Sequence, residues 1–575
     1  MVLMMNKYAL SLLAMLLVML TVTSPQAQDH SPTDTLTAQL RQLLEDRGQP
    51  AVLNTGGYGS TLTDETFRFY RQRHFAPGWL SLAGLSGQGR NLLTVLQSAH
   101  QEGLRPEEYH VPTIAVLAEQ LRIFAGQGMP EGILPMARLD ILLTDAFLRY
   151  AGDVTGGRVE AAKVYPEEWR AAPRSIDLVE TLQHNLEYGQ AVEALRDMLP
   201  TDRDYRRLRD YLAAYRQLAA EGGWSQIPDG PPLRPGESDW RLPWLRQHLI
   251  QVGDLDPAYW IYENYFDQMA AEALWRFQAR HSLKSDGVLG PETLAALNVS
   301  VEERIRQIEI NLERWRWLAR DLGRRYLAVN IADFSVEVVE EGEAVLSMPV
   351  VVGTDYRRTP VFSAQLRYLD FAPYWNVPLT ILREDKLPLI KADRNYLASH
   401  HYEIVARRNG VVEPIEPGSV DWEGVTAETF PGLLRQKPGP WNSLGRVKFM
   451  FPNKFHVYLH DTPQRHLFDR KRRSYSSGCI RVKRPFDLAF YLLQHQEGWA
   501  AQRIEEAMAA DETLRVLLDE PLPVHILYRT AWVDGEGGLQ FRNDVYQRDA
   551  VLYTALRRHN RKTAVLVACR SEILQ

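Results

Sequence analysis

The chain of 575 residues is too long for a single hydrophobic core, and its length indicates roughly three or four domains. Its composition, 45% hydrophobic and 24% charged residues, is that of a soluble globular protein. The formal net charge is −6 and no long run carries a single sign, which argues against a nucleic-acid partner because phosphate binding needs a clustered basic face. The one basic cluster, Arg470-Lys471-Arg472-Arg473, is interpreted as a solvated loop in preference to an attractor of anionic substrate.

The N-terminal segment, residues 1–27, predicts an export signal or an N-terminal anchor. Lys7 supplies a positive start, residues 8–22 are mainly apolar, and small and polar residues follow. Pro25 is awkward just before a cut after Ala27, and the apolar run is short for a membrane span, so cleavage and retention both stay open. We expect the bulk of the chain to lie outside the cytoplasm, with membrane contact only through an uncleaved N-terminal segment.

Residues 35–230 have the periodicity of a helical scaffold domain. Leucines and other apolar residues recur three and four positions apart, and breakers that contain Gly and Pro separate the periodic stretches. No catalytic constellation stands out, and Phe69, Tyr70 and Trp79 are interpreted as packing aromatics rather than a ligand platform. Residues 223–238 are rich in Gly and Pro and mark a domain boundary.

A compact helical unit is predicted over residues 240–298. Two turns, Asp286-Gly287 and Gly290-Pro291, divide it, and the proline stands where a helix begins. The run over residues 277–298, with its Asp-Gly, Leu-Gly-Pro and Thr-Leu steps, resembles the peptidoglycan-binding-like domain found beside many wall enzymes. The resemblance implies a three-helix module that contacts peptidoglycan glycan, although such modules can also serve only as spacers.

A linking helix over residues 301–322 leads into a β-rich domain over residues 326–535. Alternating patterns and turn residues predict strands or hairpins at 327–331, 335–339, 344–352, 365–372, 455–460 and 524–532, and a helix at 485–495. Residues 536–575 are left as a C-terminal tail, and no role is predicted for Cys569.

Between Trp375 and Phe449 the strand rhythm breaks, which indicates an insertion over residues 378–448. A helical pair, a hairpin and a loop rich in Pro and Gly are expected in it. It could fold over a functional site as a lid, or it could decorate the sheet, and the sequence does not decide between the two. The fold class predicted for the whole chain is multidomain α+β, with a helical scaffold and a small module before a mainly β domain.

The chain contains only two cysteines, and Cys479 is framed as Ser476-Ser477-Gly478-Cys479-Ile480-Arg481. His460 lies nineteen positions earlier, at the end of the alternating run His456-Val457-Tyr458-Leu459-His460. Residues two apart in a strand share a face, so His456, Tyr458 and His460 are expected to point the same way. A Cys and a His on adjacent elements are the minimal parts of a thiolate nucleophile with its base, although most free cysteines are small buried hydrophobes.

The residues around Cys479 suit an activated thiol. Gly478 permits close backbone approach, and Arg481 brings a fixed positive charge that favours the thiolate. Ser476 and Ser477 can donate hydrogen bonds to an imidazole or a substrate. The sequence offers no cluster of metal-ligand type, and no metal or cofactor is expected.

The pattern His460-Asp461-Thr462-Pro463, followed by Ser476 to Val482, resembles the signature of L,D-transpeptidases with the YkuD-type catalytic domain. The resemblance runs from about Tyr326 to Val533. The helical region, the module and the insertion together resemble the large periplasmic branch of that family. Many relatives carry a histidine directly before the glycine, and Ser477 stands there in this chain, which leaves His460 as the candidate base.

The resemblance implies that Cys479 attacks the carbonyl of the L-centre of meso-diaminopimelate in a tetrapeptide stem and forms a thioester as the terminal D-alanine leaves. His460 would take the thiol proton and later activate the acceptor amine, which gives a 3→3 crosslink. Backbone amides of the cysteine loop would form an oxyanion hole, Tyr458 would hold the imidazole or the substrate, and Ser476 and Arg481 would position the substrate.

The resemblance further implies a periplasmic protein whose thiol carbapenem-type β-lactams acylate. Its partners would be peptidoglycan stem peptides and glycan, with other wall-synthesis enzymes as further candidates. Two alternatives stay open: net hydrolysis, as in an L,D-carboxypeptidase or an enzyme that cleaves a lipoprotein-to-wall link, and a non-catalytic wall-binding scaffold. The intact Cys–His pair argues against the scaffold.

Overall fold

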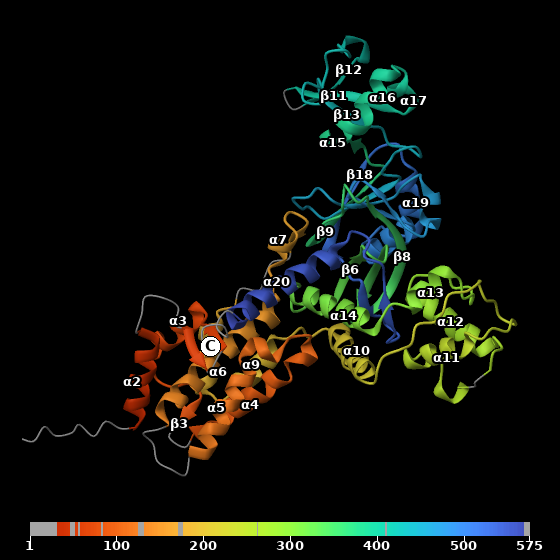
Figure 1. Ribbon diagram of the computed structural model, residues 1–575. Helices are drawn as coiled ribbons and strands as arrows, with labels where there is room; N and C mark the ends of the chain where they lie inside the picture. Colours follow the sequence, from red (N-terminus) through yellow and green to blue (C-terminus); the bar gives the residue numbers. More distant parts are fainter. Residues whose placement is uncertain are drawn as a thin grey trace, which may run out of the picture.

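The computed structural model describes residues 32–45, 52–55, 58–81, 84–124, 132–170, 176–260, 263–408 and 411–568. The segment predicted as a signal or anchor and Cys569 lie outside these residues. Figure 1 shows a helical N-terminal region, a small helical module beside it, a curved sheet, and an insertion at the end of the sheet remote from the helical region. None of the described helices is long and apolar enough to cross a membrane.

The N-terminal region is built around helix α6 (Ile133–Gly156), which is buried along most of its length. Asp140 on α6 has no exposed surface and accepts the backbone N–H groups of Gly78, Trp79 and Leu80 at 2.8–3.1 Å. This carboxylate anchors the loop of residues 78–80 to α6, and the side chain of Trp79 is fully buried. The other elements are α2 (Pro32–Glu45), β1 (Val52–Thr55), β2 (Tyr58–Thr61), α3 (Asp64–Gln72), β3 (Leu80–Ser81), β4 (Gly84–Leu85), α4 (Gly87–Gln97), η1 (Ala99–Glu102), η2 (Pro106–Tyr109), α5 (Val111–Phe124), α7 (Ala161–Val164), β5 (Trp169–Arg170), α8 (Leu178–Glu187) and α9 (Ala191–Met198).

Two packed helices, α10 (Arg203–Ala220) and α14 (Val301–Arg316), join the parts of the chain. α14 is the linking helix predicted from the sequence, and the Ser300 hydroxyl caps it by accepting the Glu303 N–H at 3.2 Å. Buried Glu313 pairs with Arg316 at 2.8 Å and also accepts the N–H of Val159 at 3.2 Å. The helix is therefore fastened to the N-terminal region by a buried, hydrogen-bonded carboxylate.

The module consists of α11 (Leu242–Gln251), the short turn η4 (Pro257–Tyr259), α12 (Gln268–Arg280) and α13 (Pro291–Leu297) around its own apolar core. Gln278 is fully buried, donates to the Val288 carbonyl at 2.9 Å and accepts the Gly287 N–H at 2.8 Å. Gly287 has φ of +68°, which a residue with a side chain adopts only with strain. One buried amide thus fixes the turn that precedes α13.

The sheet of the C-terminal half closes on itself. Its strands pair in the order β14-β15-β17-β8-β7-β6-β18-β9, and β14 also pairs with β9, which completes a ring. Alternate residues such as Val329, Phe449 and Ile480 fill the interior with no exposed surface. The strands are β6 (Arg325–Asn330), β7 (Ser335–Glu340), β8 (Glu343–Gly353), β9 (Val361–Phe371), β14 (Val447–Met450), β15 (Leu459–His460), β17 (Ile480–Val482) and β18 (Leu514–Leu527), with β16 (Ser474–Ser476) paired to β8 and β5 paired to β9.

This arrangement confirms the predicted fold class. Two helices, α18 (Pro485–Leu493) and α19 (Ala501–Ala509), follow β17 and pack on the barrel, the first of them at the position predicted from Pro485.

Three expectations about this half are corrected. The stretch 455–460 contains only the two-residue strand β15, because His456 has φ of +56° and turns the chain before it. Residues 524–532 are not a hairpin: β18 continues between β6 and β9, and the hairpin is formed by β19 (Ala531–Val533) and β20 (Leu539–Phe541). The expected tail, 536–575, contains β20 and α20 (Arg548–Ala568), and Leu552 and Leu556 of α20 join the barrel core.

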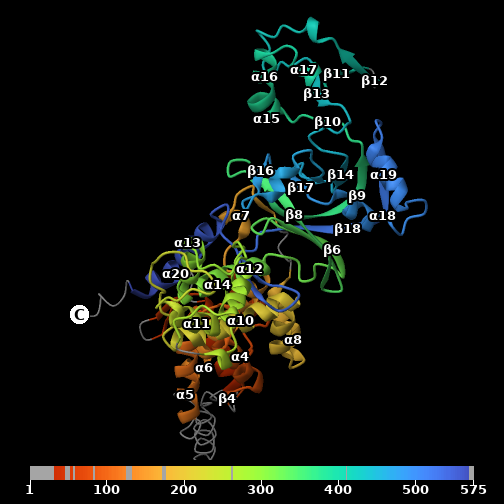
Figure 2. The ribbon, with the colours of Figure 1, turned by 90° about the vertical axis from the view of Figure 1, so that its right-hand side faces the viewer.

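The insertion has a small core of its own and stands beyond the end of the barrel, as Figures 1 and 2 show from two directions. Its strands pair in the order β10-β13-β11-β12, and the hairpin of β11 and β12 lies where the sequence predicts one. The elements are β10 (Trp375–Asn376), α15 (Leu379–Ile381), the π-turn η5 (Leu382–Lys386), α16 (Leu387–Ala392), α17 (Tyr396–Ser399), β11 (Tyr402–Arg408), β12 (Val411–Ile415), η6 (Pro417–Ser419) and β13 (Leu433–Gln436).

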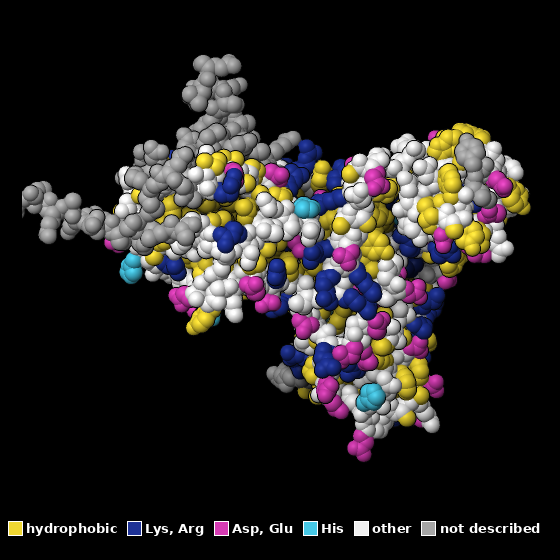
Figure 3. All heavy atoms as spheres, turned by 90° about the horizontal axis from the view of Figure 1, so that it is seen from below, with side chains coloured by type: hydrophobic (Ala, Val, Ile, Leu, Met, Phe, Trp, Pro, Cys, Tyr) yellow, Lys and Arg dark blue, Asp and Glu magenta, His cyan; other side chains and the backbone are white. Residues whose placement is uncertain are grey.

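Charged side chains of both signs are interspersed on the face seen in Figure 3, which therefore offers no basic stripe for nucleic acid. The basic run at 470–473 is tied into the structure. Lys471 pairs with Glu292 of the module, Arg472 pairs with Asp355 at 2.5 Å, and Arg473 lies 5.3 Å from the centroid of the Phe334 ring.

Candidate active site

Two short parallel strands bring His460 and Cys479 together. In the pairing of β15 with β17, Leu459 lies opposite Ile480 and His460 lies opposite Arg481. The Ile480 N–H also donates to the Tyr458 carbonyl at 3.1 Å. Cys479 directly precedes β17, so this register places it beside Tyr458, the residue directly before β15 and two positions from His460.

The register places a row of charged and titratable side chains across five strands. Directly paired residues share a face of the sheet, and successive pairs join Arg515, Asp370, Lys448, His460 and Arg481. The apolar neighbours that alternate with them point into the barrel. The row therefore lies on the outer face, and Cys479, two residues before Arg481, lies at the same place.

The sulfur of Cys479 is half-buried and surrounded by polar groups. Sγ lies 3.8 Å from the His456 carbonyl oxygen, to which the thiol can donate. Burial raises the thiol pKa, although hydrogen bonds from the backbone and side chain of Tyr458 and the charges of Lys448 and Arg481 all favour the thiolate. In the free protein the sulfur is therefore a protonated thiol at neutral pH, and attack on a carbonyl requires a base that removes its proton.

His460 is buried and neutral. Its Nδ1 donates to the Asp461 carbonyl, and a hydrogen bond with the Leu444 carbonyl also favours the protonated ring. Burial and the charge of Arg481 outweigh these contacts and lower the His460 pKa to about 3. The imidazole is thus uncharged at neutral pH, which is the state that a general base requires.

The backbone of the cysteine loop is held by hydroxyl groups. Gly478 has φ of +108°, and its carbonyl accepts a hydrogen bond from the buried Thr359 hydroxyl at 2.9 Å. The Ser476 hydroxyl accepts the Gly478 N–H at 3.2 Å and donates to the Cys479 carbonyl. The Gly478 amide is therefore already committed, whereas the Cys479 N–H has no acceptor among the described residues and is available to a substrate oxygen.

Arg357 joins the cysteine loop to the insertion. Its guanidinium donates to the Ser477 hydroxyl at 2.9 Å and to Asp385 at 2.7 Å, and it also pairs with Glu384. Both acidic residues belong to η5. The contact places the insertion beside the site, and it assigns Ser477 to this bridge rather than to the imidazole.

Four of the seven predicted site residues lie together, and the other three, Ser476, Ser477 and Gly478, make the loop contacts described above. Tyr458, His460, Cys479 and Arg481 converge, and Tyr458 and His460 share a face with ring centroids 5.8 Å apart. His456 is exposed, and only its carbonyl faces the sulfur.

Three further residues at the site were missed by the sequence analysis: Lys448, Thr359 and Arg357. Lys448 contributes its Nζ, 4.0 Å from the centroid of the Tyr458 ring. The only sequence signal for Lys448 is its alternation with Val447 and Phe449 in a strand pattern.

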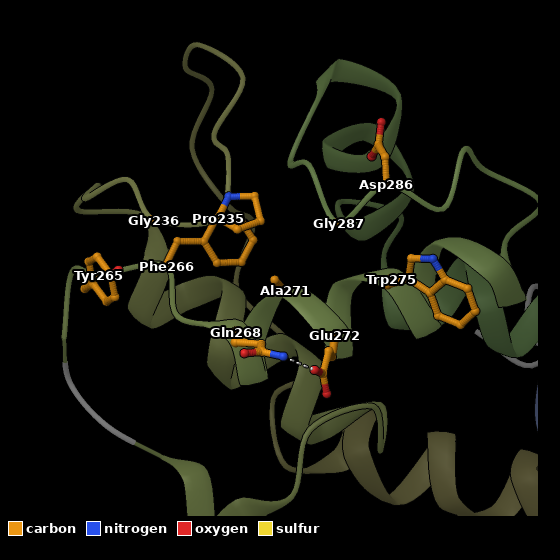
Figure 4. A pocket seen from close by; sticks show the side chains of 10 residues that line it. All are labelled: Pro235, Gly236, Tyr265, Phe266, Gln268, Ala271, Glu272, Trp275, Asp286 and Gly287. Atoms are coloured by element: carbon orange, nitrogen blue, oxygen red, sulfur yellow. Dashed lines mark hydrogen bonds between the residues drawn. The ribbon is translucent and has the colours of Figure 1, made fainter.

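The module carries a separate hollow, shown in Figure 4. The cavity of about 480 Å³ is flanked by Trp275 on one side and Tyr265 on the other, each about half-exposed. Gln268 donates to Glu272 at 2.8 Å along its floor. Among the residues that the structure describes, no group of three or more His, Cys, Asp or Glu is placed to hold a metal ion.

Comparison with protein families places three matches on the chain. Residues 324–497 match the model of the L,D-transpeptidase catalytic domain, residues 241–297 match a "Putative peptidoglycan binding domain", and residues 64–212 match a scaffold domain. The chain thus carries a YkuD-type L,D-transpeptidase catalytic domain and a peptidoglycan-binding domain, which confirms both resemblances.

A curated relative from Haemophilus influenzae, named "Putative L,D-transpeptidase", is 38% identical over 221 residues, which cover 38% of this chain and 44% of the relative. The chain thus matches less than half the length of that relative. An L,D-transpeptidase structure from Xylanimonas cellulosilytica is 12% identical, with 52% of this chain and 99% of that chain covered and a TM-score of 0.16. One from Stackebrandtia nassauensis is 13% identical, with 53% and 97% covered and a TM-score of 0.21.

Proposed function

We propose that the chain is an L,D-transpeptidase that forms 3→3 peptidoglycan crosslinks through a thioester on Cys479. The observation that carries this proposal is the convergence of a half-buried thiol, a neutral buried imidazole and two cations on paired strands of a YkuD-type domain. A neutral base beside a neutral thiol suits proton transfer that accompanies attack on a carbonyl.

In the proposed acylation, His460 takes the Cys479 proton as the sulfur bonds to the carbonyl carbon of the L-centre of diaminopimelate. The carbon–nitrogen bond to the terminal D-alanine then breaks, and the amine leaves with the proton from His460. The Cys479 N–H is the amide that remains available for the oxyanion, and Tyr458 donates to the sulfur. An acceptor amine then displaces the sulfur, which regenerates the thiol.

The peptidoglycan-binding module supports the same substrate class. Its hollow between Trp275 and Tyr265 offers aromatic faces and the polar groups of Gln268 and Glu272, which suits a sugar or a stem peptide. We assign this hollow to wall contact and the barrel to chemistry. This division predicts that loss of the module's contact lowers wall binding while Cys479 keeps its reactivity.

The test is the muropeptide profile of cells that express the wild type or Cys479→Ala. The wild type is expected to produce 3→3 crosslinked species and the variant none. Equal amounts with both proteins would refute catalysis and leave the wall-binding scaffold. Tripeptides without crosslinks from the wild type would identify an L,D-carboxypeptidase instead, since water then serves as the acceptor.

A further inference from the structure

Lys448 is a half-buried cation that lies beside Cys479 and forms no ion pair within the described part of the chain. It lies between Asp370 and His460 in the cross-strand row, and its Nζ rests on the face of the Tyr458 ring. The carboxylate directly opposite it, Asp370, is held by Arg515 through hydrogen bonds of 2.7 and 3.1 Å. None of the ion pairs among the described residues includes Lys448.

The charges of the row do not balance within the protein. Arg515 and Asp370 cancel each other, and His460 is neutral, so Lys448 and Arg481 leave two positive charges. Ionisation of Cys479 compensates only one of them. A partly desolvated charge without a counter-ion is unfavourable, so the site is complementary to one further anion.

Arg481 is the less available of the two cations. It donates to the Gln464 side chain at 2.5 Å, and it lies beyond His460 in the row. Lys448 Nζ lies on the ring face of Tyr458, and none of the hydrogen bonds among the described residues uses its ammonium N–H groups, so a ligand can accept them. An incoming carboxylate would therefore meet Lys448 first.

We propose that Lys448 binds the C-terminal carboxylate of the donor peptide, one residue beyond the carbonyl that Cys479 attacks. This inference rests on the proposed function. In a donor that ends at the leaving residue, one carbon atom separates the scissile nitrogen from the terminal carboxylate, which must then enter the space around the sulfur. Lys448 thereby selects donors whose chain ends directly after the scissile bond and discriminates against amidated or extended chains.

The direct test is peptide binding to the full chain carrying Cys479→Ala, in which no turnover occurs. A tetrapeptide stem that ends in a carboxylate is compared with the same stem ending in a carboxamide. With Lys448 present the acid should bind about tenfold more tightly, the size of a partly screened charge contact. Adding Lys448→Met should bring the preference close to unity, while Lys448→Arg should retain it. An unchanged preference in the Met variant overturns the proposal.

Lys454→Met is the matched control. Lys454 also rests on an aromatic ring, with Nζ 5.2 Å from the centroid of Phe455, but it is exposed and lies outside the row. Its loss removes the same charge from the same segment and should leave the acid preference intact. A fall as large as that of Lys448→Met would show a general effect of net charge and would overturn the assignment to Lys448.

A second readout does not depend on the proposed substrate. Iodoacetate and iodoacetamide both form a sulfur–carbon bond with Cys479 as iodide leaves, and they differ by one carboxylate. The ratio of their rates should fall about fivefold in Lys448→Met and stay unchanged in Lys454→Met. An unchanged ratio in Lys448→Met overturns the anion site. A reduced ratio together with no binding of either stem would overturn the donor assignment and the proposed function while the anion site stands.

Discussion

The hydroxyl of Tyr458 is expected to set the acidity of Cys479. Its side chain and backbone make the largest contributions that oppose the effect of burial on the thiol pKa. Tyr458→Phe removes the hydroxyl and keeps the ring on which Lys448 rests. A hydrogen bond to a charged group contributes about 1.5–3 kcal/mol, so the thiol pKa should rise by about one to two pH units.

The assay is the rate of Cys479 alkylation by iodoacetamide as a function of pH, followed by the mass of the modified protein. The midpoint of the rate profile should move upward by that amount in the Phe variant. Tyr475→Phe is the control, because Tyr475 is a half-exposed tyrosine four residues before the cysteine and should leave the midpoint unchanged. A midpoint for Tyr458→Phe that stays in place or moves downward would refute the role of the hydroxyl.

Two further predictions concern His460 and the module. The His460 pKa of about 3 lies below that of an unfolded histidine, which is about 6.5. Between these pH values the unfolded chain binds a proton that the folded chain does not bind. The stability of the fold therefore falls as the pH falls. The free energy of unfolding, measured with urea at pH 6 and pH 4.5, should therefore depend less steeply on pH in His460→Gln. Its slope should be smaller by up to about 1.4 kcal/mol per pH unit. Trp275→Ala should weaken co-sedimentation of the full chain with isolated sacculi severalfold, because the ring flanks the module's hollow.

Each of these two variants has a matched control variant. His400→Gln changes an exposed histidine of the insertion and should leave the pH slope as it is, so equal slopes for both histidine variants would contradict the assignment. Trp240→Ala removes a tryptophan of the module that is 54% exposed, close to the 50% of Trp275, but does not line the hollow. Equal losses of sacculus binding would show that any exposed aromatic of the module suffices.

The sequence predicts that the segments of His460 and Cys479 lie side by side because both signals are local. One signal is a histidine at the end of an alternating run, and the other is a Gly-Cys step before a proline that starts a helix. Each signal lies within one chain segment, and the parallel pairing of β15 with β17 brings the two segments side by side. The same holds for Gly287, whose turn residues sit next to each other in the chain. Local patterns of this kind can be predicted from the sequence because they depend on the backbone geometry of neighbouring residues.

Lys448, Thr359 and Arg357 could not be predicted in this way. Lys448 reaches the site only through the register of β14 against β15, which depends on how the ring of strands closes. Thr359 and Arg357 act on the cysteine loop from more than a hundred positions earlier in the chain. α20 was not predicted either: Leu552 and Leu556 have helical spacing, but a helix after the last strands does not fit the strand pattern that precedes it.

The neutral resting state has a consequence for catalysis. The charges of Arg481 and Lys448 favour a thiolate, but the same charges oppose an imidazolium on His460, so they assist one partner of the proton transfer and hinder the other. If a donor carboxylate binds Lys448, one of the two opposing charges is compensated and His460 becomes a stronger base. Arg481 and the two hydrogen bonds from Tyr458 still stabilise the sulfur. Binding of an anionic donor would then switch on the proton transfer, and the free thiol would stay protected from indiscriminate reaction in the absence of substrate.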